Sequence, residues 1–125
     1  MKRVYLALGL LALCISLCTF EQYTVERMYK DTTAMINDAI ECTEKEDFKN
    51  AEKICKNLKA YWDKKYPYLT AMIDHGALDE AAAVIYSLED MAKDESEDLK
   101  NELTAVKNQI KIIRGNQKVS LGNIL

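Results

Sequence analysis

The sequence predicts an all-α protein, in which a single N-terminal transmembrane helix is followed by a small antiparallel bundle of about four helices. Three observations carry this prediction. Residues 4–20 contain no charged side chain. Beyond them, apolar residues recur at steps of three and four, which is the spacing of one face of an α-helix. The chain has only four glycines and one proline, so few residues interrupt a helix.

Residues 1–20 are predicted to be a membrane anchor that is not cleaved. The uncharged stretch is at the short end of what spans a bilayer, and it also suits the apolar core of a signal peptide. The sequence from Leu17 to Glu21 lacks the small residues that signal cleavage requires, and leucines precede Cys14 and Cys18, where a lipoprotein signal needs a small residue. A cleaved signal and a lipoprotein signal remain as alternatives.

The charges that flank this segment predict its orientation. Lys2 and Arg3 precede it and Glu21 follows it. Basic residues stay on the cytoplasmic side of a membrane span, so the N-terminus is expected in the cytoplasm. Residues 21–125 are then an extracytoplasmic domain of the cell membrane.

Four stretches of this domain are predicted to be helical. Residues 21–43 carry a first apolar stripe, and we expect them to continue directly from the anchor because no glycine or proline separates the two. Residues 48–75, 77–93 and 99–113 carry the others. The stripe of residues 48–75 has Trp62 at its middle, and we expect this side chain to be the central packing residue. Pro67 lies within the stripe, which predicts either one kinked helix or two helices nearly in line.

Helix ends are predicted from single residues. Asp47 is placed to cap the helix that begins at Phe48, and Gly76 is placed to end it. Gly115 and Asn116 are expected to end or fray the last helix. The tail beyond them contains four large apolar side chains, and we expect it to dock on its own bundle or on a partner; these are Val119, Leu121, Ile124 and Leu125.

Charge and motifs exclude several classes of function. Residues after position 20 carry 15 bases and 20 acids, a net charge of −5, with no basic stripe, so we expect no nucleic-acid partner. The sequence contains no phosphate-binding loop, nucleophile elbow or zinc-ligand spacing. We therefore expect no enzyme, no catalytic residue, no cofactor and no metal site. Four lysines of the central stretch are interpreted as a solvated face: Lys56, Lys59, Lys64 and Lys65.

Four residues are candidates for an interaction or ligand site: Tyr61, Tyr68, Asp74 and His75. The tyrosines lie on the shoulder of the apolar stripe, where aromatic residues serve either interfaces or the boundary of a bundle. The single histidine follows an acid near the expected end of a helix. The negative end of the helix dipole would stabilise its partial positive charge there. A ligand or pH-sensing role is the alternative for this pair.

The cysteines are expected to carry free thiols. Folding the chain about a turn near Lys45 leaves Cys42 and Cys55 offset by about 9 Å of helix rise, which is more than a disulfide tolerates. Cys14 and Cys18 lie in the apolar segment and are interpreted as lipid-facing or helix-facing residues.

The chain resembles domain-of-unknown-function family 4363, a group of short membrane-anchored proteins of Gram-positive bacteria. The resemblance covers nearly the whole chain, and Gly122 departs from it because an acid is expected there. It implies the topology and the helical fold, and no activity. The residues that carry it are the anchor, Trp62, the run from Leu69 to His75, Leu78-Asp79, Ser120-Leu121 and Asn123-Ile124-Leu125.

The function predicted from these observations is that of a non-catalytic interaction or accessory protein at the outer face of the membrane. Its partners would be the membrane, through residues 4–20, and a protein, either a membrane protein or a second copy of the chain. Two alternatives remain open. One is a small ligand-binding or pH-sensing module at Tyr68, Asp74 and His75, and the other is a soluble secreted helical domain released by signal cleavage.

Overall fold

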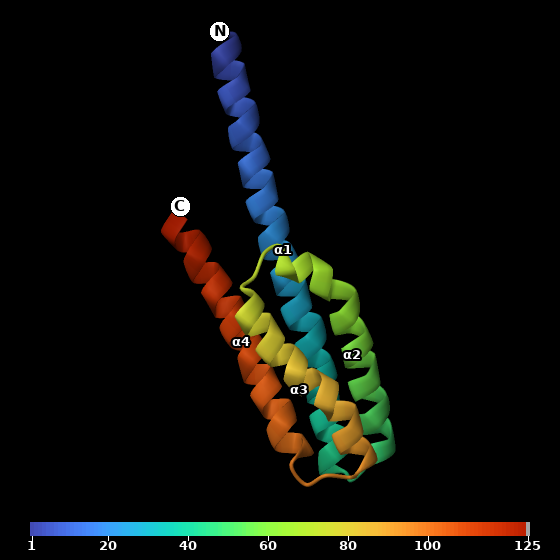
Figure 1. Ribbon diagram of the computed structural model, residues 1–125. Coiled ribbons are helices and arrows are strands. Elements are labelled where there is room, and N and C mark those ends of the chain that lie inside the picture. Colours follow the sequence, from blue (N-terminus) through green and yellow to red (C-terminus); the bar gives the residue numbers. More distant parts are fainter. Residues whose placement is uncertain (125) are drawn as a thin grey trace.

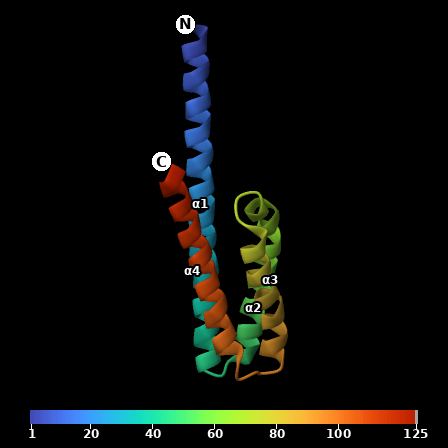
Figure 2. The same ribbon diagram turned by 60° about the vertical axis from the view of Figure 1, so that its left-hand side comes forward.

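The computed structural model describes residues 1–124, and the side chains of residues 1–116. It consists of α1 (Lys2–Glu44), α2 (Phe48–Thr70), α3 (His75–Lys93) and α4 (Leu99–Ile124). Each helix packs on the next, and α4 packs on α1, which closes an up-and-down ring of four antiparallel helices (Figures 1 and 2). The predicted all-α class and the bundle are confirmed.

Helix α1 has two different halves. It continues without interruption from the apolar segment into the bundle, as the absence of glycine and proline between them predicts. Residues 2–20 extend alone beyond the other helices (Figure 1), and their large apolar side chains are exposed. The second half buries a single stripe against α2 and α4; its members are Val25, Met28, Thr32, Ile36 and Ala39. The Thr32 hydroxyl satisfies itself by donating to the Met28 carbonyl oxygen at 2.6 Å.

The predicted apolar stripes form the core. Trp62 is fully buried, which confirms it as a central packing residue. Its indole N–H has no hydrogen-bond partner among the described residues, so apolar contact must stabilise this position. The other large side chains that are fully buried come from all four helices: Met28, Ile36, Leu58, Leu69, Leu78, Ile85, Leu88, Leu99, Leu103, Ile110 and Ile113.

The end of α2 differs from the prediction. The helix ends at Thr70, not at Gly76, and it bends near this end (Figure 1). Pro67 explains the difference, because its ring has no N–H and crowds the carbonyl of the residue four positions earlier. The Thr70 hydroxyl also bonds to the Pro67 carbonyl oxygen at 3.0 Å, which competes with continuation of the helix.

His75 and Gly76 consequently belong to the next helix. His75 is the first residue of α3 and Asp74 is its N-cap residue, without a side-chain capping bond. The predicted interaction of His75 with a helix C-terminus was therefore wrong, since the residue lies at the opposite end of a helix dipole. Gly76 lies in the first turn of α3 and is not a C-terminal cap.

Two tight turns lie at the other end of the bundle. Asp47 caps α2 as predicted, because its carboxylate accepts the Asn50 N–H. Glu46 and Glu95 both have left-handed backbone conformations, with φ of 58° and 52°. These residues reverse the chain after α1 and after α3, where a helix end commonly uses glycine.

Helix α4 is longer than predicted, because it does not end at Gly115 and continues to Ile124. A glycine lowers helix stability by only about 1 kcal/mol, which is less than a break requires. The predicted docking of Val119, Leu121, Ile124 and Leu125 concerns side chains outside the described residues.

All four cysteines carry free thiols, as predicted. Cys55 is fully buried on α2 and Cys42 is half-buried on α1. Burial raises the pKa of the Cys55 thiol to about 11, so it remains protonated at neutral pH and behaves as a small apolar residue.

Candidate functional site

A groove of about 230 Å³ lies between α1 and the C-terminal part of α2, next to Phe20 and the start of the packed half of α1. We call it the α1–α2 groove. Helix α1 supplies one wall, and α2 with the turn after it supplies the other. Its lining residues are Phe20, Tyr23, Thr24, Arg27, Met28, Tyr61, Lys65, Tyr68, Leu69 and Met72.

The wall on α1 follows from helical spacing. Phe20, Thr24 and Arg27 recur at steps of four and three, so they lie on the same face of the helix. Met28 lies beside them and is buried in the core. Phe20 is the last residue of the uncharged segment, so this face joins the apolar half of α1 to the packed half.

The apolar floor and the aromatic rim of the groove come from both helices. Met28 and Leu69 are buried beneath it, while Phe20, Tyr23 and Tyr68 are 60%, 60% and 62% exposed. Large aromatic side chains that stand this far into solvent expose apolar surface that a ligand could cover. The groove therefore offers apolar contact below a partly polar rim.

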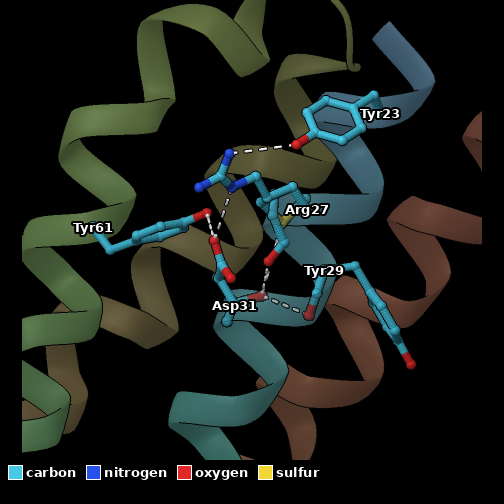
Figure 3. A network of polar contacts seen from close by, with 7 residues as sticks. Tyr23, Arg27, Tyr29, Asp31 and Tyr61 are labelled. Carbon is cyan, nitrogen blue, oxygen red and sulfur yellow. Dashed lines mark hydrogen bonds and ion pairs between the residues drawn. The ribbon is translucent and has the colours of Figure 1, made fainter. Parts of the chain in front are cut away.

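A polar network crosses the groove between the helices (Figure 3). The Tyr61 hydroxyl on α2 donates to Asp31 Oδ2 on α1 at 3.0 Å. Arg27 Nε lies 3.9 Å from the same carboxylate oxygen, and Arg27 Nη1 donates to the Tyr23 hydroxyl at 3.5 Å. Burial, together with the Asp31 carboxylate, raises the pKa of Tyr61, so the phenol stays neutral and acts as a hydrogen-bond donor.

Two cations converge on this network. Lys65 Nζ lies 5.8 Å from the centre of the Tyr61 ring, within the range of a cation–π contact. Arg27 is exposed over most of its side chain, and its contact with Asp31 is long for an ion pair. Arg27 and Lys65 both line this end of the groove, whereas Asp31 contacts Arg27 and Tyr61 from outside the lining, which leaves the groove with a positive local charge in a chain that is acidic overall.

The structure brings together only two of the four predicted site residues. Tyr61 and Tyr68 both line the groove, although Tyr61 is half-buried and Tyr68 is exposed. Asp74 and His75 are exposed at the start of α3 and do not line it. Of the predicted corner of Tyr68, Asp74 and His75, only Tyr68 lines this groove, and α2 ends before Asp74 and His75.

Sequence reasoning missed the α1 wall. Arg27 and Tyr23 were not candidates, and Lys65 was assigned to a solvated face, whereas it is half-buried in the groove. A signal for the α1 residues was present in the sequence. Phe20 ends the uncharged segment, and Tyr23 and Arg27 follow it at helical spacing; aromatic residues and cations are enriched where a span meets water.

Two further tyrosine–aspartate contacts hold α2 against α3. The Tyr66 hydroxyl donates to Asp79 at 2.7 Å and the Tyr86 hydroxyl donates to Asp63 at 2.5 Å. The hydrogen bond to Asp63 raises the pKa of Tyr86 to about 12. These pairs orient neighbouring helices and do not form a cavity with the α1–α2 groove.

The groove contains groups suited to binding rather than to acid–base chemistry. Its titratable lining groups are two cations and tyrosines, and the neighbouring Asp31 carboxylate, which is not part of the lining, is engaged by Tyr61 and Arg27. Over the part of the chain that the structure describes, no group of three or more histidine, cysteine or acidic side chains is arranged to hold a metal ion. The arrangement is suited to an elongated apolar group that carries a negative charge at one end.

Helix α1 is long and apolar enough to cross a membrane, and its most apolar stretch is entirely exposed. This property is compatible with a single-pass anchor or with a signal sequence. No curated protein and no solved structure matches the chain. A family model described as a domain of unknown function, DUF4363, matches residues 19–124, which include the whole bundle. The chain therefore belongs to the DUF4363 family.

Proposed function

We propose that this chain is a non-catalytic accessory protein, which a single membrane span holds at the outer face of the cell membrane so that its bundle binds a protein partner. The observation that carries the proposal is the exposed apolar half of α1. From Val4 to Phe20, every leucine, isoleucine and aromatic side chain is more than half exposed. Transfer of each such side chain from water is favourable by about 1.5–3 kcal/mol.

The continuity of α1 adds a second argument. A helix without a break transmits its orientation from the span to the bundle, whereas a flexible linker would not. The bundle would therefore stand directly above the membrane with the α2–α3 turn toward it (Figure 1). A partner at the membrane surface, either a membrane protein or a second copy, would meet the bundle at a defined height.

The orientation follows from the flanking charges. Lys2 and Arg3 favour a cytoplasmic N-terminus, which leaves the bundle outside. A reporter enzyme that is active only outside the cytoplasm, fused after Leu125, should be active. The same reporter fused after Arg3 should be inactive. Activity of both fusions or of neither would contradict the orientation.

Membrane retention tests the anchor itself. The full-length chain should remain in the membrane fraction after a high-salt wash, and its intact mass should include residues 2–20. A soluble form that begins near Glu21 would contradict the anchor and support a secreted helical domain.

A protein partner is sought by a separate experiment. Membrane-impermeant crosslinking followed by mass spectrometry would identify a partner at Tyr68, with the distal Lys49 as the matched control position.

The α1–α2 groove favours a second candidate function, that of a small ligand-binding module. It supplies an apolar floor, aromatic rims and two cations in one place. It differs from the predicted Asp74 and His75 site in position and chemistry. The two functions are compatible, because a ligand could occupy the α1–α2 groove while the bundle binds a protein partner.

A further inference from the structure

We infer that the α1–α2 groove binds an anionic phospholipid of the outer leaflet. The phosphate would lie against Arg27 and Lys65, and the first part of an acyl chain would lie on Phe20 and Met72. This inference rests on the proposed membrane anchor. It assigns a ligand class to a site that the family description leaves without one.

The depth of the groove supports a lipid. The uncharged segment of residues 4–20 is about 25 Å long at 1.5 Å per residue, while the hydrocarbon core is about 30 Å thick. The boundary of the hydrocarbon thus falls a few ångströms beyond Phe20. Arg27 lies about 10 Å farther along the helix than Phe20, which is close to the outer limit of the headgroup layer.

Side-chain direction brings Arg27 closer to that layer. Side chains on an α-helix lean toward its N-terminus, which for α1 is the direction of the membrane. The contact of Arg27 Nη1 with the Tyr23 hydroxyl, one turn nearer the membrane, is consistent with this lean (Figure 3). The guanidinium therefore occupies the depth at which phospholipid phosphates lie.

The polarity along the groove matches the polarity of a lipid. Phe20 marks its membrane end, and Arg27, Lys65 and Tyr61 gather at the end away from it. A lipid whose acyl chain lies on the apolar residues at the membrane end would place its phosphate beside the cations at the other end. A small soluble anion would not contact the apolar half of the groove.

The local charge favours an anionic headgroup over a zwitterionic one. Arg27 and Lys65 carry two positive charges, and Asp31 offsets one of them through its long contact with Arg27. A phosphodiester with no compensating amine would balance the remaining charge. Tyr23 and Tyr68 stand at the rim, where exposed tyrosines suit the boundary between lipid and water.

The test is native mass spectrometry of the full-length chain in detergent, with dioleoyl phosphatidylglycerol and dioleoyl phosphatidylcholine as probes. We expect preferential retention of phosphatidylglycerol. The double variant Arg27→Gln, Lys65→Gln should retain it about tenfold less. The control Lys49→Gln, Lys64→Gln removes two exposed α2 lysines outside the groove and should retain it as the unmodified protein does.

A third variant tests the apolar half without changing charge. Thr24→Trp should fill the groove and reduce retention of phosphatidylglycerol, while the helical circular dichroism of the protein stays unchanged. Equal retention of the two lipids, or equal loss in the double variant and its control, would overturn the inference. Complete displacement by millimolar glycerol phosphate would also overturn it, because that result would indicate an anion site without an acyl contact.

Two other outcomes are distinguished by the same spectra. A dimer that Thr24→Trp converts to a monomer would show that a second copy occupies the groove, and would overturn the lipid assignment. A mass that begins near Glu21 would contradict the anchor whatever lipid is retained. Full-length protein that retains no phosphatidylglycerol would leave the anchor in place and reject the lipid site.

Discussion

The two halves of α1 belong to one uninterrupted helix and have opposite surfaces. Residues 2–20 present apolar side chains on every side, and all their large members are exposed. Residues 21–44 confine the apolar side chains to one stripe, which α2 and α4 cover. The same backbone structure thus carries two different kinds of surface.

This difference separates what forms a helix from what holds it in place. Both halves satisfy their backbone hydrogen bonds internally, and that satisfaction is what a lipid environment requires of a spanning segment. Only the second half is stabilised by packing against protein. Substitutions should therefore affect membrane retention in the first half and unfolding in the second, and each prediction below tests that division.

The largest expected effect concerns the packed half. Trp62→Ala should lower the free energy of unfolding by about 3–5 kcal/mol, because it empties a fully buried site in the core. A domain of this size has only about 5–15 kcal/mol in total. Urea unfolding followed by circular dichroism measures the change.

A matched substitution in the exposed half provides the control for Trp62→Ala. Leu11→Ala removes a large apolar side chain that is 58% exposed, so it should leave the unfolding of the bundle unchanged. Trp62→Phe keeps most of the buried volume and should cost much less than alanine. A midpoint that Trp62→Ala barely shifts would contradict the assignment of this side chain to the core.

A charge in the exposed half should produce the next largest effect. Leu11→Arg places a cation at the middle of the span, at a cost of about 2.5–3.5 kcal/mol for insertion. Membrane retention should fall, as fractionation and immunoblotting would measure. Asn37→Arg adds the same charge to an exposed position of the packed half and should leave retention unchanged. Equal retention of both variants would contradict a transmembrane role for residues 4–20.

Much of this organisation could be predicted from the sequence, because periodicity reports directly on burial. The stripes that include Val25, Trp62 and Ile85 are buried as expected, and Asp47 caps α2. The ends of α2 and α4 could not be predicted as well. Glycine was given too much weight at Gly76 and Gly115, while the crowding around Pro67 was given too little.

The candidate site was harder to predict because it joins two helices. The sequence places Tyr61 and Tyr68 at the edge of one apolar stripe. Their partners on α1, however, depend on the register between α1 and α2. Asp31 lies thirty positions from Tyr61 in sequence, and the hydrogen bond between them follows from packing rather than from any local motif. A pattern within one helix cannot supply that register.

High pH should weaken the packed half alone. The Cys55 thiol has a pKa near 9 when unfolded and about 11 in the fold, because burial disfavours the thiolate. The native state therefore holds its proton more tightly, so stability that is complete below pH 9 is lost between pH 9 and pH 11, by up to about 2.7 kcal/mol. Tyr86, raised to about 12 by Asp63, should add to the loss above pH 10.

Urea midpoints at pH 8 and pH 10.5 measure this dependence. Cys55→Ala should lower stability at pH 8 and flatten the slope with pH, because the titrating group is gone. Cys14→Ala, in the exposed half, should alter neither value. An alkaline wash should leave the chain in the membrane even where the bundle loosens. An unchanged slope in Cys55→Ala would show that this thiol does not control the alkaline loss.

The smallest expected effect concerns the ion pair that ties α4 to α1 just inside the bundle. Arg114 Nε lies 2.7 Å from Glu26 Oε1, and its guanidinium lies 4.3 Å from the centre of the Tyr29 ring. Both charged side chains are partly exposed, so a double-mutant cycle of Glu26→Gln and Arg114→Gln should give a coupling below about 1 kcal/mol that decreases with salt.

Its local effect should be clearer than its global one. Arg114 is paired with Glu26, close to the place where α1 leaves the bundle, and α3 and α4 diverge toward that end of the molecule (Figure 2). Loss of the pair should therefore let the amides of residues 110–116 exchange faster with solvent, while those near Leu103 keep their protection. Arg114→Lys keeps the charge and loses the planar contact with Tyr29, so it separates the two contributions. If amide exchange instead became faster along all of α4 in every variant, the pair would stabilise the whole bundle. The end of α4 beside the exposed half of α1 would then not differ in stability from its middle.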